Sequence, residues 1–250
     1  MSHALRERLA LRPGVTFGPF RFLEALPWMV LAAAFRVLAF GSPGLAIVFI
    51  TLATIAVLNA FIVVTQRSIE LTGGQSGLGE LSFAESFRLS LTILRWTVPL
   101  MVLVAFCCLK LAGQAYAPFF MLGIDGMAFA QHNLTGMLWS AVIATLILLM
   151  IVEAGRVGQI SPLAVGAELL RHGVWLLLGI AALTASYVAL GLVQDLVRDL
   201  LMQFWRSSPL NQLFKNLIMF IFIFSFAMLR MWVTLLVLTM ALKQSYTCAR

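Results

Sequence analysis

Ionisable residues inside long apolar runs are the residues of this sequence that could do chemistry. Arg230 lies near the middle of the apolar run 217–242. A charge at the centre of a bilayer costs about 2.5–3.5 kcal/mol on insertion scales, so such residues need a partner or a water path. The nearest acids in predicted depth are Glu153, after the run 134–152, and then Glu168. We expect Arg230 to form a buried ion pair, to line a ligand or ion pathway, or to lie near a headgroup at the end of an overlong helix.

Two further charge pairs share one pattern, Glu-x-x-Arg directly before an apolar run. They are Glu85 with Arg88, and Glu168 with Arg171. A spacing of three places both side chains on one helix face, and the helix dipole favours the acid at the N-terminal position. We interpret each pair as part of a short surface helix that turns into the membrane. The echo reflects either a parallel duplication or the same capping requirement at two helix starts.

The sequence contains no catalytic or cofactor motif. Asp125 and His132 share one connector, but a metal site needs three or four ligands. Glycines of the stretch 73–79 follow an apolar run rather than a strand, so they do not form a phosphate-binding loop. The histidines have no serine or acid motif around them. We therefore predict no catalytic residue, no metal and no cofactor, and a protein that is not an enzyme; an intramembrane enzyme is the minor alternative.

The composition decides which elements must position these residues. Hydrophobic residues make up 62% of the 250 residues and charged residues only 11%, with a mean hydropathy of +1.00. Soluble domains are about 45–50% apolar and about 25% charged. The excess must face lipid, so this is an integral membrane protein. The net charge of +7 is scattered between apolar runs, which excludes the basic patch that a nucleic-acid partner requires.

The apolar runs predict an all-α integral membrane protein with a single domain over 1–250 and about six transmembrane helices. A bilayer-spanning helix needs about 20 apolar residues. Arg36 weakens the first span, where we expect it to reach the interface by snorkelling. In residues 194–206 the polar positions recur with a helical period and form a stripe along one face. This pattern predicts an interfacial amphipathic helix. The six spans are 22–40, 45–66, 89–113, 134–152, 173–193 and 217–242.

The distribution of Lys and Arg predicts the orientation. Six spans place both termini on one side of the membrane. If that side is the cytoplasm, eleven Lys and Arg residues lie inside and five outside, as the positive-inside rule requires. The connector 114–134, which has no Lys or Arg, is then external, and the connectors 67–88 and 153–172 are internal.

The layout of two segments resembles a known group of membrane proteins. A helix ends at an arginine, a Gly/Pro connector follows, and a tryptophan-containing helix re-enters the membrane. This arrangement resembles six-helix bacterial inner-membrane proteins near the membrane-domain family attached to some glycerophosphodiester phosphodiesterases. Glu168-Leu169 and His172-Gly173 depart from the Ser-Trp and Gly-Asn expected there. The resemblance implies a polytopic helical fold in a bacterial inner membrane and says nothing about chemistry. The matching residues are Arg67, Arg95, Trp96, Arg156, Pro162, Arg171 and Trp175.

Two functions remain open from the sequence. The first is a non-enzymatic inner-membrane protein, an accessory or scaffold subunit whose partners are the lipid bilayer and a membrane protein or second copy of itself. The second is a transporter or channel for a small solute, ion or lipid that uses Arg230 and Glu153. A cavity that reaches Arg230 would favour the second function.

Overall fold

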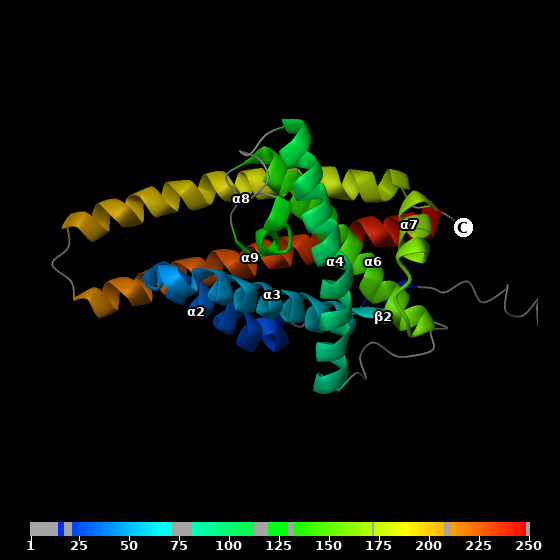
Figure 1. Ribbon diagram of the computed structural model, residues 1–250, viewed down its shortest axis with the longest axis horizontal. Helices are drawn as coiled ribbons and strands as arrows, with labels where there is room; N and C mark the ends of the chain where they lie inside the picture. The colour runs from blue at the N-terminus through cyan, green and yellow to red at the C-terminus, as the bar shows by residue number, and fades with distance from the viewer. Residues whose placement is uncertain are drawn as a thin grey trace, which may run out of the picture.

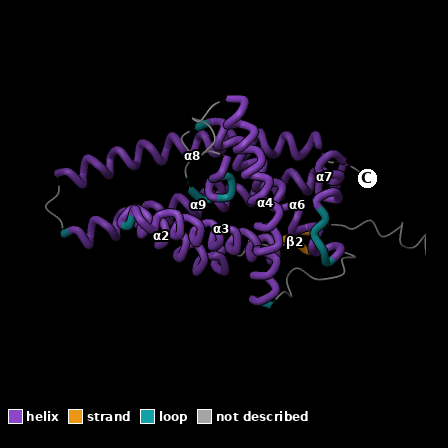
Figure 2. The backbone as a smooth tube through the Cα atoms, in the orientation of Figure 1, coloured by secondary structure: helices purple, strands orange, loops and turns teal. Residues whose placement is uncertain are grey.

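The computed structural model describes residues 15–17, 22–71, 82–112, 120–129, 133–171, 173–207 and 211–248. Helices make up most of this part of the chain (Figures 1 and 2). The α-helices are α2 (Leu26–Gly41), α3 (Ala46–Ser68), α4 (Phe83–Ala112), α6 (Leu134–Val157), α7 (Pro162–Arg171), α8 (Gly173–Ser207) and α9 (Gln212–Cys248). Shorter elements are η1 (Phe22–Ala25), η2 (Pro43–Leu45), η4 (Asp125–Met127), β1 (Val15–Phe17) and β2 (Ile69–Leu71).

Five of these helices are long and apolar enough to cross a membrane: α3, α4, α6, α8 and α9. This confirms the prediction of an all-α, multi-pass membrane protein. The remaining predicted span, 22–40, corresponds to η1 and α2. Because α2 has 16 residues, it is about 24 Å long, which is shorter than the hydrocarbon core of about 30 Å.

The two longest helices form the axis of the molecule. In Figure 1, α8 and α9 run side by side, the α2–α3 hairpin lies along α9, and α4 crosses their direction steeply. A Cβ atom on Gly179 of α8 would lie 2.7 Å from the Cβ of Ala241, so this close approach requires glycine. Further along the same helix pair, the Tyr187 hydroxyl and Thr234 Oγ1 are 2.7 Å apart and share a hydrogen bond.

The prediction of a separate interfacial helix over 194–206 is wrong, because α8 continues through this segment to Ser207. Helical periodicity persists after Gly191, and no Gly or Pro interrupts the chain before Ser207. With 35 and 37 residues, α8 and α9 are about 52 and 55 Å long, so both exceed the thickness of a hydrocarbon core. Their connected ends extend beyond the turn of the α2–α3 hairpin (Figure 1). We call residues 194–207 and 212–227 the α8–α9 tip.

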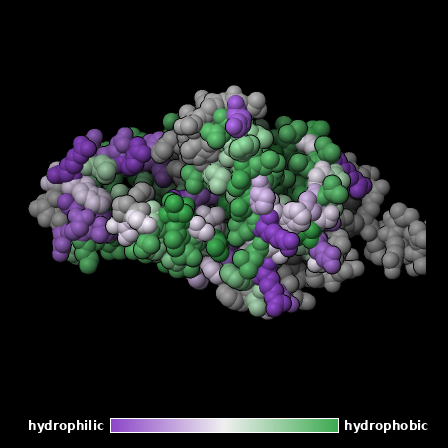
Figure 3. Space-filling view, in the orientation of Figure 1, coloured by the Kyte–Doolittle hydropathy of each residue, from purple (hydrophilic) through white to green (hydrophobic). Residues whose placement is uncertain are grey.

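The surface has the distribution expected of a membrane protein. Large hydrophobic side chains are exposed on most helices, for example Leu103 and Phe106 of α4 and Leu177 of α8. In Figure 3, hydrophobic surface covers the middle of the molecule, and hydrophilic surface gathers at the α8–α9 tip. Lipid contact accounts for exposed apolar area that a soluble protein would bury.

The two Glu-x-x-Arg pairs lie in different settings. Glu168 and Arg171 belong to the short helix α7, which ends before α8 begins, as predicted. By contrast, Glu85 and Arg88 lie in the first turns of the long helix α4, so a separate surface helix is wrong there. Glu85 caps this helix: the amide nitrogen of Ser82 donates to Glu85 Oε2 at 2.8 Å, and the Ser82 hydroxyl donates to the same oxygen at 2.7 Å. Capping rather than an ion pair therefore explains this glutamate.

Two local features mark the ends of α6 and α3, on the opposite side of the molecule from the α8–α9 tip. Gly158, with φ 78°, closes α6, and its amide donates to the Ala154 carbonyl at 2.8 Å. Only glycine adopts this left-handed conformation without strain. After α3, β2 pairs antiparallel with β1, with Thr16 opposite Glu70. This ribbon ties residues 15–17 to the end of α3.

Candidate ligand-binding cavity

The connector between α4 and α6 turns back into the helix bundle. Residues 123–128 are buried. Trp139 of α6 holds this segment, because its Nε1 donates to the Phe120 carbonyl at 2.8 Å. A Cβ on Gly123 would lie 2.9 Å from Trp139 Nε1 and from Ile143 Cγ1, so the approach depends on glycine. Part of the connector 114–134 therefore packs inside the bundle, which its sequence did not indicate, while the side of the membrane on which it lies stays a prediction. We call residues 120–129 the returning segment.

Arg36 and Asp125 form a buried ion pair across the base of this segment. Arg36 Nη2 contacts Asp125 Oδ2, and the two side chains are 16% and 4% exposed. The Arg36 guanidinium also lies over the Phe129 ring, 4.6 Å from its centroid. The prediction that Arg36 reaches the interface by snorkelling is wrong. A carboxylate supplied by the returning segment neutralises it inside the protein instead.

Arg230 contacts the same segment from α9. The residue is 1% exposed; its Nη1 donates to the Phe129 carbonyl at 3.4 Å, and its guanidinium lies 5.0 Å from the centroid of the Tyr187 ring. Thr234 links the two, since its Oγ1 bonds both the Tyr187 hydroxyl and the Arg230 carbonyl. A carbonyl oxygen and an aromatic face thus take the place of the predicted acid.

Neither Glu153 nor Glu168 forms an ion pair with Arg230 among the residues that the structure describes. The reason is their place along the bundle. Arg230 is level with Phe129, just before α6 begins at Leu134. Glu153 lies near the other end of α6, about 28 Å further along the helix at 1.5 Å per residue.

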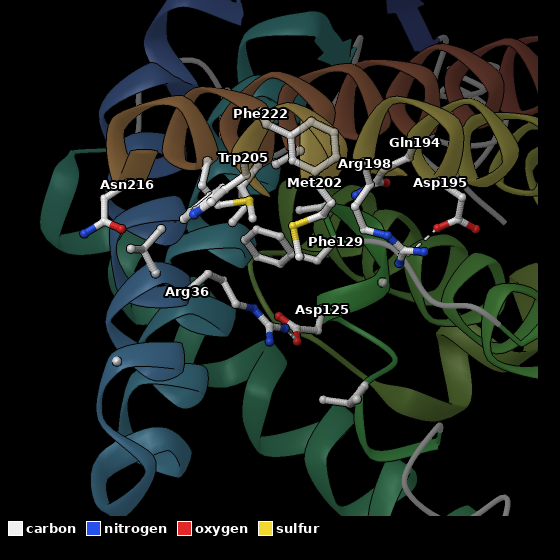
Figure 4. A pocket seen from close by; sticks show the side chains of 18 of the residues that line it. Arg36, Asp125, Phe129, Gln194, Asp195, Arg198, Met202, Trp205, Asn216 and Phe222 are labelled. Atoms are coloured by element: carbon white, nitrogen blue, oxygen red, sulfur yellow. Dashed lines mark ion pairs between the residues drawn. The ribbon is translucent and has the colours of Figure 1, made fainter. Parts of the chain in front are cut away.

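A cavity of about 650 Å³ lies between the α8–α9 tip on one side and α2 with the returning segment on the other (Figure 4). This volume falls in the range of small-ligand sites, about 300–1,000 Å³. Arg36 and Asp125 lie on one wall, and Met202, Trp205 and Phe222 lie on the opposite wall (Figure 4). Polar side chains stand at both ends of the apolar stretch: Asn216 at one end, and Gln194, Asp195 and Arg198 at the other.

The rim of the cavity carries a second set of charges. Arg198 Nη1 lies 3.2 Å from Asp195 Oδ1, and its Nη2 lies 3.6 Å from Asp199 Oδ1. These side chains are 40% or more exposed, so the pairs contribute little to stability. They place charge at the point where the cavity meets the outside.

The cavity offers binding groups, and its two carboxylates, Asp125 and Asp195, each contact an arginine. Among the described residues, its lining contains no serine, threonine, cysteine, histidine or lysine. No cluster of three His, Cys, Asp or Glu residues in the described part of the chain could hold a metal; His132, the neighbour of Asp125 in sequence, lies outside it. The arrangement can bind a molecule through apolar contacts and hydrogen bonds.

Several buried polar atoms around the cavity have unused hydrogen-bonding capacity. Within the described residues, Arg36 Nε, Asp125 Oδ1, Gln194 Oε1 and Arg230 Nη2 have no hydrogen-bond partner. Most buried polar atoms in proteins are paired, so each exception calls for an explanation. Four such atoms around one cavity mark this region as the candidate site.

Comparison with known proteins adds no relative. No family model, no curated protein and no solved structure matches the chain.

Proposed function

We propose that this chain is a non-enzymatic membrane protein that binds an amphiphile in the cavity between the α8–α9 tip and the returning segment. The observation that carries the proposal is the layout of the cavity, with an apolar middle formed by Met202, Trp205 and Phe222 and polar groups at both ends. A molecule with an apolar chain and a polar head matches this layout. The lining residues supply packing and hydrogen bonds, and the two carboxylates among them each contact an arginine.

The proposed setting is a bacterial inner membrane with both termini in the cytoplasm. Eleven Lys and Arg residues inside against five outside support this orientation. α2 would complete an even number of crossings as the partner of α3 in their hairpin, and the cavity then opens on the periplasmic side. We place the protein there as an accessory subunit that holds its ligand for a membrane protein partner or a second copy.

The contacts of Arg230 do not favour the transport alternative. Neither Arg230 nor Glu153 belongs to the lining of the cavity. Arg230 is covered by Phe129 and Tyr187, and Glu153 lies toward the far end of α6. A path that uses both residues would have to cross packed side chains.

Quenching of tryptophan fluorescence by a brominated chain tests the proposal. The purified protein in a non-ionic detergent would be titrated with 11-bromoundecyl probes that carry different heads. Trp205 lines the cavity, whereas Trp96 is exposed on α4 away from it. We expect a saturable quenching component that Trp205→Phe removes and Trp96→Phe retains. Quenching that rises linearly with every probe, or that Trp205→Phe leaves intact, would contradict binding in this cavity.

A further inference from the structure

We infer that the ligand of the cavity is a single-chain amphiphile with an anionic head, a carboxylate or a phosphate. This inference rests on the proposed function and adds the chemical class of the ligand. Its main support is the distribution of charge around the cavity, where Arg230 adds a positive charge to groups that are otherwise neutral as pairs.

The charges that line the cavity cancel in two pairs. Asp125 is neutralised by Arg36, and Asp195 lies 3.2 Å from a guanidinium nitrogen of Arg198. Arg198 also lies 3.6 Å from Asp199, but this carboxylate is 68% exposed and does not line the cavity, so water and salt screen its charge. Among the described lining residues, each carboxylate thus contacts an arginine. The lining therefore gives an ammonium head no carboxylate that lacks an arginine contact.

Arg230 adds a positive charge that no carboxylate in the described part of the chain balances. Among the described residues its contacts are the Phe129 carbonyl and the Tyr187 ring, and its Nη2 has no hydrogen-bond partner. A carbonyl dipole and an aromatic face stabilise a cation, but they do not cancel its charge. The group formed by Arg36, Asp125 and Arg230 thus carries one net positive charge.

This charge lies directly behind one end of the cavity. Ala227, which lines the cavity, precedes Arg230 by about one helical turn on α9. Phe129 separates the guanidinium from the cavity, since its ring lines the cavity and its carbonyl accepts from Arg230. Arg230 therefore acts on a ligand through its field, across a region of low dielectric constant where charges are weakly screened.

The rest of the lining sets the shape of the ligand. The apolar stretch of Met202, Met219 and Phe222 suits one flexible hydrocarbon chain, and methionine side chains adapt to such chains. The cavity, at about 650 Å³, is small for a lipid with two long chains. A fatty acid and a single-chain phosphate ester share the required chemistry, and the experiment distinguishes them.

Four probes with one chain and different heads test the inference: 11-bromoundecanoate, 11-bromoundecyl phosphate, 11-bromoundecanol and 11-bromoundecyl trimethylammonium. Affinity is read from the Trp205-dependent quenching at low salt. We expect one or both anions to bind roughly tenfold more tightly than the alcohol, the size of effect that one unit charge has at an effective dielectric constant of about 20. The carboxylate and phosphate arms show which head the site prefers.

Variants then assign the preference to Arg230. Arg230→Gln should remove the advantage of the anions and leave the affinity for the alcohol unchanged, and Arg230→Lys should restore part of it. Arg206→Gln is the matched control, because Arg206 is exposed on the tip and does not line the cavity; it should change none of the affinities.

The outcomes separate the two proposals. If the alcohol or the ammonium probe binds the unmodified protein as tightly as the anions, the anionic class is wrong while amphiphile binding stands. If no probe gives saturable, Trp205-dependent quenching, the proposed function itself fails. Because the head comparison uses the unmodified protein, it decides the class even if Arg230→Gln does not fold.

Discussion

Arg36 and Asp125 join the α2–α3 hairpin to the returning segment through one buried ion pair. Neither residue has a charged neighbour in sequence, so the pair exists only because residues 120–129 fold back into the bundle. The same segment receives the hydrogen bond from Arg230 on α9. One stretch of ten residues therefore connects three helices around the cavity.

Removal of one member of this pair should destabilise the protein strongly. Arg36→Met or Asp125→Leu leaves an uncompensated charge in a buried site, which costs about 3–5 kcal/mol, whereas the double substitution removes both charges and should recover most of that loss. Thermal unfolding of the purified variants in detergent measures the three effects. Additive losses in the double variant would contradict coupling between the two residues. Arg198→Gln breaks exposed pairs and serves as the control, with an expected effect of about 1 kcal/mol or less.

The approach of α8 to α9 should depend on Gly179. A Cβ at this position would lie 2.7 Å from Ala241 Cβ, so Gly179→Ala must push the helices apart and should lower the unfolding temperature. Ala241→Gly in the same chain should relieve the clash and restore the temperature. The control is Gly166→Ala on α7, where a Cβ meets nothing within 4 Å. This control should be neutral or stabilising by up to about 1 kcal/mol, because alanine favours helix.

Anchoring of the returning segment should depend on Trp139. Trp139→Phe keeps an aromatic ring but removes the Nε1 donor to the Phe120 carbonyl. The loss leaves a part-buried carbonyl without this partner, at a cost of about 1–3 kcal/mol. Because the segment forms one wall of the cavity, the variant should also weaken Trp205-dependent quenching by the brominated probes. Tryptophan to phenylalanine at Trp96, which is exposed on α4, should change neither stability nor binding.

The helices of this fold could be predicted from the sequence, but their ends could not. Runs of apolar residues identify spans because the bilayer fixes their length. At Gln194 the hydropathy falls, which predicts the end of a span, but the helical period continues and α8 extends to Ser207. Hydropathy indicates which part of a helix lies in the membrane, but it does not indicate where the helix itself ends.

The site was partly visible in the sequence, but its contacts were not. The sequence marks Arg36, Asp125 and Arg230 as charges of interest, but it does not indicate that they lie close together. Their proximity depends on the returning segment, which has no periodic pattern to reveal that it folds inward. The partners of Arg230 are a carbonyl and an aromatic ring, and neither is distinctive in a sequence rich in both. An acid is the partner that a buried arginine suggests, but Glu153, the acid nearest in predicted depth, lies toward the other end of α6.

The orientation of α8 should be measurable with two single cysteines, one at each end of the helix. Asp125 is unsuitable as a labelling site because it is 3% exposed. Gln203 and Gln159 are both exposed; Gln203 lies in the α8–α9 tip and Gln159 just after α6. In a background without the native cysteines, Gln203→Cys should react with a membrane-impermeant maleimide on intact cells. Gln159→Cys should react only after permeabilisation, because the positive-inside rule places its connector in the cytoplasm.

Two other labelling patterns would contradict the orientation and the spanning of α8, respectively. Labelling of Gln159→Cys alone on intact cells would reverse the orientation and place the cavity on the cytoplasmic side. Because α8 separates the two positions, a helix that crosses the membrane once leaves only one of them outside. Labelling of both sites from outside would therefore mean that α8, despite a length of 35 residues, does not span the bilayer. Permeabilised cells, in which both cysteines should react, provide the control for the accessibility of each site.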